Sequence, residues 1–197
     1  AHQNKSSYTY WVKIDTKESF TTKEQDIAGT LYLGTGKNSA EDKGSKLEIG
    51  LPLSNRTNPY VIKDGDTIYP DANGAVKFAD DAEEVTIYFG SNEDAWFTFN
   101  AAGQSALNLA YNTKFNKEIA DLFPKANIDF LTFTSKPSTN RTGDLYITAD
   151  EDTFLYEVTE DGVKEIPNAE YSEKEGAWHI RTRKLGAYAI SDTELDT

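Results

Sequence analysis

The sequence predicts an all-β protein of antiparallel, sandwich-like sheets, and three observations lead to this fold class. Apolar and polar residues alternate over many short runs, glycine-containing turn dipeptides separate these runs, and a single stretch has helical spacing. Successive side chains of a strand point to opposite faces, so a strand that is buried on one face alternates with a period of two. Short strands at close, regular spacing are typical of β-sandwiches.

The expected strands follow one another along most of the chain. The alternating runs occupy 8–15, 46–49, 84–89, 96–99, 128–133, 144–147 and 178–181. Turn dipeptides between them include Asp64-Gly65, Asn73-Gly74, Asp161-Gly162 and Glu175-Gly176. The segment 115–123 differs, because its apolar residues recur at helical spacing and Pro124 follows it. A short helix is therefore expected near 115–123.

A repeated tripeptide suggests that the chain arose by duplication. Asn-Arg-Thr occurs at 55–57 and again at 140–142, and Trp11 and Trp96 are separated by the same 85 positions. Several features that keep one order at one offset are unlikely to recur by chance. The sequence therefore predicts two related β lobes, a first at 1–92 and a second at 93–197 that carries the helix.

Charge and composition limit the kinds of binding partner that the chain is expected to have. The net charge of −13 is spread along the chain, and such a field repels nucleic acid and anionic membranes, whereas neutral sugars or cations remain compatible. The chain has no Cys, no Met and no apolar run of transmembrane length. We expect a processed fragment of a larger multidomain protein that is extracellular, either secreted or attached to the cell surface, and monomeric.

No pattern indicates catalysis. Cys is absent, the two His stand at 2 and 179, and motifs such as G-x-S-x-G, the Walker loop and H-E-x-x-H do not occur. The carboxylates are numerous, but their spacing picks out no pair, so we expect neither an enzyme nor a cofactor. Three Asp-rich segments, 64–67, 71–74 and 149–153, lack the full spacing of a calcium loop. Ordinary turns explain them, and a structural calcium ion stays an open alternative.

Two tryptophans are placed on polar strand faces by the alternation. Trp96 shares a face with Thr98 and Asn100, while Phe97 and Phe99 lie on the other face, and Trp11 likewise shares a face with Lys13. A large aromatic on a solvent face is expected to be covered or used. Two alternatives follow: the tryptophans pack in a seam between lobes, or they serve as platforms for sugar rings, which have an apolar C–H face.

The repeated Asn-Arg-Thr also has alternatives. Its side chains supply polar contacts to a ligand, or they bond the backbone of a loop ahead of a strand, or the motif is a glycosylation acceptor. Trp178 shares a face with Ile180, which favours a core position. The predicted carbohydrate-binding residues are Trp11, Lys13, Asn55, Arg56, Trp96, Asn140, Arg141 and Trp178.

Three segments carry a resemblance to a known family. These are FGSNEDAWFTFNAAGQSALNLAYNTKF at 89–115, TGDLYITADEDTFLYEV at 142–158 and WHIRTRKLGAYAISDTEL at 178–195. They resemble domains of large secreted surface proteins of gut Firmicutes, most nearly the two-lobed starch-binding modules of amylosome starch-adherence proteins. The resemblance implies a non-catalytic, β-rich module that binds α-1,4-glucan chains through aromatic side chains.

The predicted function is therefore binding of a neutral polysaccharide. The expected partner is starch, as amylose or amylopectin, together with maltooligosaccharides. The alternative is a structural or spacer domain of a large cell-surface protein that binds no ligand.

Overall fold

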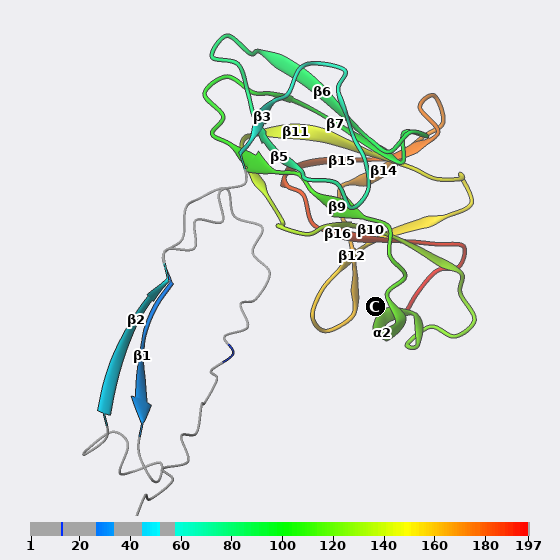
Figure 1. Ribbon diagram of the computed structural model, residues 1–197. Helices are drawn as coiled ribbons and strands as arrows, with labels where there is room; N and C mark the ends of the chain where they lie inside the picture. The colour runs from blue at the N-terminus through cyan, green and yellow to red at the C-terminus, as the bar shows by residue number, and fades with distance from the viewer. Residues whose placement is uncertain (1–12, 14–26, 34–44, 52–57, 197) are drawn as a thin grey trace, which may run out of the picture.

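A computed structural model describes residue 13 and residues 27–33, 45–51 and 58–196 (Figure 1). Almost every regular element in these residues is a strand, so the predicted all-β, sandwich-like class is confirmed. Trp11, Asn55 and Arg56 lie outside the described residues. The duplication, which rests on them, stays a prediction.

Strands β1 and β2 form a hairpin-like pair near the N-terminus. They span Ile27–Leu33 and Ser45–Leu51, and they pair antiparallel from Ile27↔Leu51 to Leu33↔Ser45. The predicted run at 46–49 thus lies inside a strand. Lys13 is exposed and belongs to no helix or strand.

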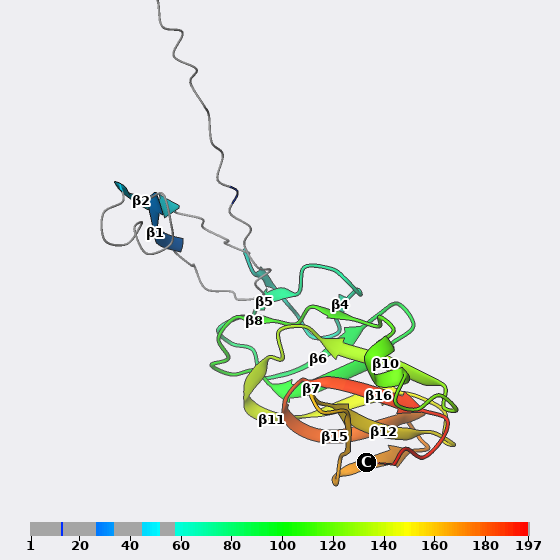
Figure 2. The same cartoon turned by 90° about the horizontal axis from the view of Figure 1, so that it is seen from below.

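The largest sheet has six strands in the order β14-β15-β11-β7-β6-β4, and Figure 2 labels β15, β11, β7, β6 and β4 of this sheet. Their bounds are Ala169–Ser172 for β14, Ala177–Lys184 for β15, Ser138–Thr148 for β11, Ala95–Asn100 for β7, Glu84–Phe89 for β6 and Thr67–Ile68 for β4. All neighbours pair antiparallel except β4 and β6, which are parallel. The long strand β11 thus lies in the interior of the sheet.

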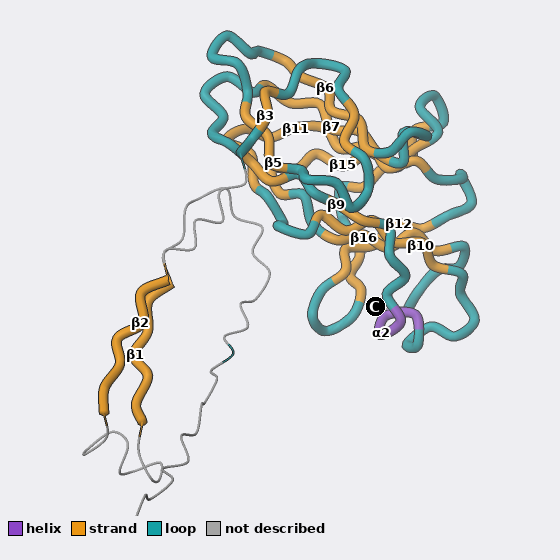
Figure 3. The backbone as a smooth tube through the Cα atoms, viewed as in Figure 1, coloured by secondary structure: helices purple, strands orange, loops and turns teal. Residues whose placement is uncertain are grey.

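Two smaller sheets complete the sandwich (Figure 3). The five-stranded sheet, in the order β13-β12-β16-β10-β9, contains Val163–Glu165, Phe154–Val158, Ala187–Ser191, Ile128–Phe133 and Tyr111–Asn112. The three-stranded sheet, in the order β3-β5-β8, contains Tyr60–Val61, Ala75–Lys77 and Leu107–Asn108.

One apolar core joins these three sheets. Its main cluster takes Phe97 and Leu145 from the six-stranded sheet, Phe133 from the five-stranded sheet and Val76 from the three-stranded sheet, each 0% exposed. The ring of Phe89 meets that of Phe133 edge-on at 4.9 Å. Such aromatic pairs contribute about 0.5–1.5 kcal/mol beyond their buried area. The inner face of the six-stranded sheet is therefore fixed by packing, which leaves its outer face for contacts with solvent or a ligand.

The single helix among the described residues, α2, spans Lys117–Ala120. It lies within the predicted segment 115–123 but is shorter, because turns follow at once from Asp121. The side chain of Asn116 caps it by accepting from the backbone N–H of Ile119. Ile119 joins a second apolar cluster with Ile128 and Tyr156, so the helix packs against the five-stranded sheet.

The predicted lobe boundary at 92/93 falls in the turn between β6 and β7. These strands pair along their whole length, from Glu84↔Asn100 to Phe89↔Ala95. The main core likewise holds residues from both sides of the boundary, from Ile62 to Tyr188. Residues on both sides of 92/93 therefore share one core, and the division of the chain into two lobes stays a prediction. The cross-strand pairing of β6 with β7 is the physical reason for the shared core.

In the part of the chain that the structure describes, no helix is both long enough and apolar enough to cross a membrane.

Candidate functional site

The outer face of the six-stranded sheet carries Trp96, as the alternation predicted. Along β7 the side chains of Trp96, Thr98 and Asn100 are partly exposed, whereas Phe97 and Phe99 are 0% and 3% exposed. The two phenylalanines anchor the strand in the core. Because successive side chains of a strand point to opposite faces, Trp96 points outward where Phe97 points inward.

Three rings form a row across this face, here called the aromatic row: Trp96, Tyr146 and His179. Trp96 pairs with Tyr146 across β7 and β11, and Tyr146 pairs with His179 across β11 and β15. The indole and phenol rings lie 4.9 Å apart and nearly parallel, at 8°, and the phenol and imidazole rings lie 4.7 Å apart at 23°. One face of the indole is thus covered by Tyr146, and its second face lies on the side of β6, where Tyr88 pairs with Trp96.

A polar row runs beside the aromatic row, one step along the same strands. Asp144 pairs with Thr98 on one side and Arg181 on the other. Its Oδ1 accepts a hydrogen bond from His179 Nε2 at 2.8 Å and lies 3.6 Å from Arg181 Nε. The carboxylate therefore links the aromatic row to the guanidinium, and both remain accessible, with side chains 40% and 68% exposed.

Asn140 and Arg141 reach this face through a bulge in β11. The pairing of β11 with β15 shifts between Ser138 and Gly143. Asn140 donates to the carbonyl of Ala102, and Arg141 Nη1 donates to Asn100 Oδ1 on the outer face of β7. The exposed guanidinium of Arg141 therefore lies against the last residue of β7, four residues along that strand from Trp96.

The second Asn-Arg-Thr does not form the loop ahead of a strand that one interpretation of the sequence predicted. Residues 140–142 lie inside β11, because the bulge lets the strand continue through them. The buried Thr139 secures the bulge: its hydroxyl donates to the Arg141 carbonyl at 2.6 Å, and its own carbonyl accepts from Arg183. The first Asn-Arg-Thr lies outside the described residues.

A lysine borders the row in the turn between β14 and β15. Lys174 Nζ donates to Glu175 Oε1 at 2.6 Å, and this hydrogen bond and charge raise the pKa of Lys174. The charge of Tyr146 contributes to the same rise in the pKa of Lys174, after Glu175. The outer face thus carries cations and anions together with its aromatic rings.

Trp178 lies on the opposite side of the sheet from Trp96. It pairs with Ile147 and Tyr171, packs against the main core, and its Nε1 donates to Thr153 Oγ1 at 3.1 Å. The core position that its alternation favoured is thus found. The structure puts Arg141 on the face of β7 that carries Trp96, at the far end of the strand, and Asn140 beyond that end at Ala102, whereas Trp178 lies on the other side of the sheet.

Tyr146, His179 and Asp144 were not among the predicted site residues. The alternation placed each on a strand, but their grouping depends on the register of β11 against β7 and β15, which the sequence does not specify. The sequence indicates only that Asp144 and Tyr146, two positions apart in the run at 144–147, lie on the same face of their strand.

The arrangement suits recognition of a ligand with an apolar surface and many hydroxyls. Aromatic rings offer the apolar contact, while carboxylate, amide and guanidinium groups supply acceptors and donors around them. A metal site is not indicated, because the described residues contain no group of three or more His, Asp or Glu that could hold an ion.

Comparison with known proteins gives no family. No family model matches the chain, and no curated protein matches it either.

Proposed function

We propose that the chain is a non-catalytic carbohydrate-binding module of an extracellular bacterial surface protein. The observation that carries this proposal is the aromatic row with Asp144 and Arg181 beside it, together with Arg141 further along the same face of β7 at Asn100. The choice of starch and maltooligosaccharides as ligands follows the family resemblance of the sequence.

The physical basis is the match between a glucan and this face. A sugar ring stacks its C–H face on an aromatic ring, and its hydroxyls both donate and accept hydrogen bonds. The indole of Trp96 has one face free of Tyr146, on the side of Tyr88, and the partly exposed Thr98, whose hydroxyl shares a hydrogen bond with that of Thr86, lies on the same face of β7. Individual contacts of this kind are weak, so affinity is expected to rise when one long glucan engages several modules.

A pull-down on insoluble starch tests the proposal, with cellulose and xylan as controls. We expect retention on starch that falls strongly in Trp96→Ala, because the variant loses the platform. Phe154→Ala is the matched control: Phe154 is an exposed aromatic (38%) on the five-stranded sheet. Retention of Trp96→Ala equal to wild type, with both variants folded by circular dichroism, would contradict the proposal.

One observation favours the second candidate, a structural or spacer domain. Trp96 is stacked in parallel on Tyr146, so its ring already contributes to holding β7 against β11. Absence of retention on every polysaccharide, together with a loss of stability in Trp96→Ala, would support this candidate instead.

A further inference from the structure

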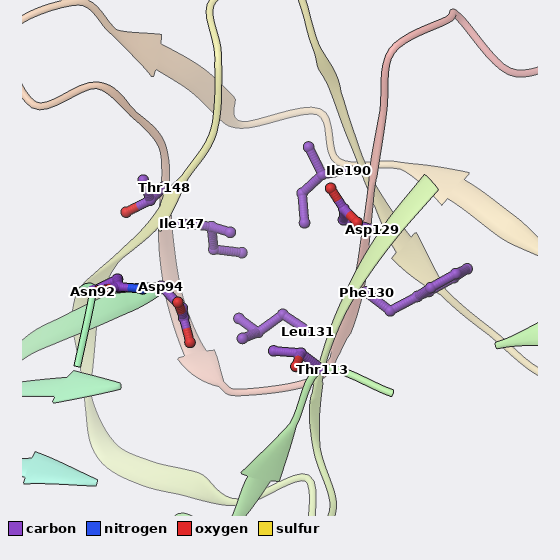
Figure 4. A pocket seen from close by; sticks show the side chains of 9 residues that line it. All are labelled: Asn92, Asp94, Thr113, Asp129, Phe130, Leu131, Ile147, Thr148 and Ile190. Carbon is purple, nitrogen blue, oxygen red and sulfur yellow. The ribbon is translucent and has the colours of Figure 1, made fainter. Parts of the chain in front are cut away.

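A pocket of about 410 Å³ opens where the β6–β7 turn, the end of β11 and the start of β10 meet (Figure 4). Asn92, Asp94 and Thr148 lie along one side of it, and Asp129 and Ile190 lie across from them. The pocket is distinct from the aromatic row, since it opens between the two large sheets and contains none of the three rings.

The carboxylate of Asp94 is held in place at this pocket. Its Oδ2 accepts a hydrogen bond from the hydroxyl of Tyr111 at 3.3 Å, and Tyr111 is 1% exposed. Gly90 makes room for it, because a Cβ there would lie 2.2 Å from the same oxygen, and the φ of +83° also suits glycine. Burial, and then the charge of Asp94, raise the pKa of Tyr111, which keeps the phenol protonated as a donor. The acceptor is thus pre-oriented.

The inner part of the pocket is apolar. Leu131 and Ile147 are 2% and 1% exposed, and they face each other from β10 and β11 together with the partly buried Ile190 (Figure 4). These side chains belong to, or pack against, the main core. Leu131 and Ile147 form its closed floor, so the apolar contact open to a ligand is that of the partly buried Ile190, while polar groups stay at the rim.

The rim defines the chemistry of the ligand. Its two ionisable groups, Asp94 and Asp129, are both carboxylates, so an anion is disfavoured and hydrogen-bond donors are required. A bare metal ion does not fit, because the inner side chains supply no oxygen ligands. Thr113, Thr148 and Asn92 add groups that both donate and accept. A pocket near 400 Å³ lies in the lower range of small-molecule sites, so it suits a ligand of disaccharide size or smaller.

We propose that this pocket binds the terminal sugar residue of a neutral oligosaccharide, with Asp94 and Asp129 accepting hydrogen bonds from its hydroxyls and the partly buried Ile190 contacting its apolar face. The inference rests on the proposed function and deepens it. The open outer face accommodates the interior of a long glucan, whereas the small pocket selects a chain end.

Two sugars separate the pocket from the aromatic row. Maltotriose is linear and has chain ends, whereas α-cyclodextrin is a closed ring of the same α-1,4-linked glucose and has none. Isothermal titration calorimetry is carried out with the intact chain and with two pocket variants, Asp129→Ala and Thr113→Trp. The first removes an acceptor from an exposed residue, and the second fills the pocket from an exposed position. Asp161→Ala, an exposed carboxylate between β12 and β13, is the matched control.

The expected result is a selective loss. Asp129→Ala should weaken maltotriose binding roughly tenfold or more, the usual effect of losing a hydrogen bond to a charged group. Thr113→Trp should weaken maltotriose binding to a similar extent. Both pocket variants should bind α-cyclodextrin like wild type, whereas Trp96→Ala should lose α-cyclodextrin binding. Circular dichroism confirms that each variant folds.

Three results would overturn the pocket assignment. If both pocket variants bind maltotriose like wild type, the pocket is not the site for the chain end. If α-cyclodextrin binding still depends on Trp96 in that case, the proposed function remains in place. Binding of 1-hexylamine but not of maltotriose, abolished in Asp129→Ala, would make this an amine site. No binding of either sugar to the wild-type chain would overturn both proposals.

Discussion

Tyr146 lies between two rings, and this position couples three strands through side chains alone. It stacks on Trp96 of β7 on one side and on His179 of β15 on the other. The imidazole of His179 is held in turn by a hydrogen bond to Asp144, which lies on the same strand as Tyr146, two positions before it in the sequence. Cross-strand pairs of aromatic side chains contribute about 0.2–1 kcal/mol each to a sheet. The centre of the aromatic row therefore stabilises the fold as well as shaping the outer face.

Two substitutions at Tyr146 separate the contribution of its ring to stability from that of its hydroxyl. Tyr146→Phe keeps both stacks and should leave the free energy of unfolding and starch retention nearly unchanged. Tyr146→Leu removes the stacks and should lower the free energy of unfolding by about 0.5–1.5 kcal/mol, and Trp96 loses its orientation. Urea unfolding and near-ultraviolet circular dichroism of the indole measure the two effects. Equal behaviour of Phe and Leu variants would show that the stacking contributes nothing.

Part of this site follows from the sequence at the scale of single residues. Alternation alone places Trp96 outward with Phe97 and Phe99 inward, and it places Trp178 with the core, as found. It does not show that Tyr146 and His179 flank each other, because that depends on which residues of β11 and β15 lie opposite. Register is set by the packing of the inner face and by the bulge, and both are properties of the folded chain.

At the scale of elements, β11 is the strand on which the outer face depends. It pairs with β7 on one side and β15 on the other, and its bulge turns Arg141 toward Asn100. Gly143 follows the bulge at a place where the backbones approach closely. A Cβ there would lie 2.6 Å from the Thr98 carbonyl oxygen and 2.6 Å from Phe99 Cβ, so no side chain fits without movement of the neighbouring strand.

Gly143→Ala should therefore destabilise the sheet. Forcing a methyl group into packed surroundings costs about 1–3 kcal/mol, and the variant should lower the midpoint of thermal unfolding accordingly. Gly186→Ala is the matched control, because its nearest atom would be 3.8 Å away. A loss of stability in Gly186→Ala as large as that in Gly143→Ala would argue against a steric cause.

Elements were predicted unevenly, and the reasons are physical. The runs at 84–89 and 96–99 became strands because each alternates and is buried on one face, whereas the strand at 128–133 buries Ile128 and Phe130 on one face and Leu131 and Phe133 on the other. The helix shortened to one turn, since only Ile119 of its residues is buried. The predicted boundary at 92/93 falls between two paired strands, because sequence similarity between segments says nothing about which strands share a sheet. The parallel pairing of β4 with β6 likewise leaves no local signal.

At the scale of the whole molecule, two buried tyrosines connect the core to pH. Tyr188 is 4% exposed, and burial is the main cause that raises its pKa to about 12, opposed by the backbone N–H of Gly186 and aided by Glu157. Tyr111 shifts in the same direction through burial and Asp94. Both phenols lie in the main core, so ionising either one places a charge in an apolar interior.

The sandwich should accordingly lose stability in alkali. For Tyr188 the folded-state pKa of about 12 lies above the ordinary value of 10.0, so the unfolded chain releases its proton first as pH rises. The contribution is fully present below pH 10 and is lost as pH rises toward 12. A difference of two pKa units corresponds to about 2–3 kcal/mol. Urea unfolding between pH 8 and 12 should show this decline in wild type and a shallower one in Tyr188→Phe. Tyr69→Phe, at an exposed tyrosine (56%), is the control. Parallel declines in all three proteins would place the alkaline sensitivity outside Tyr188 and assign it to the repulsion among the many acidic groups of a chain with net charge −13.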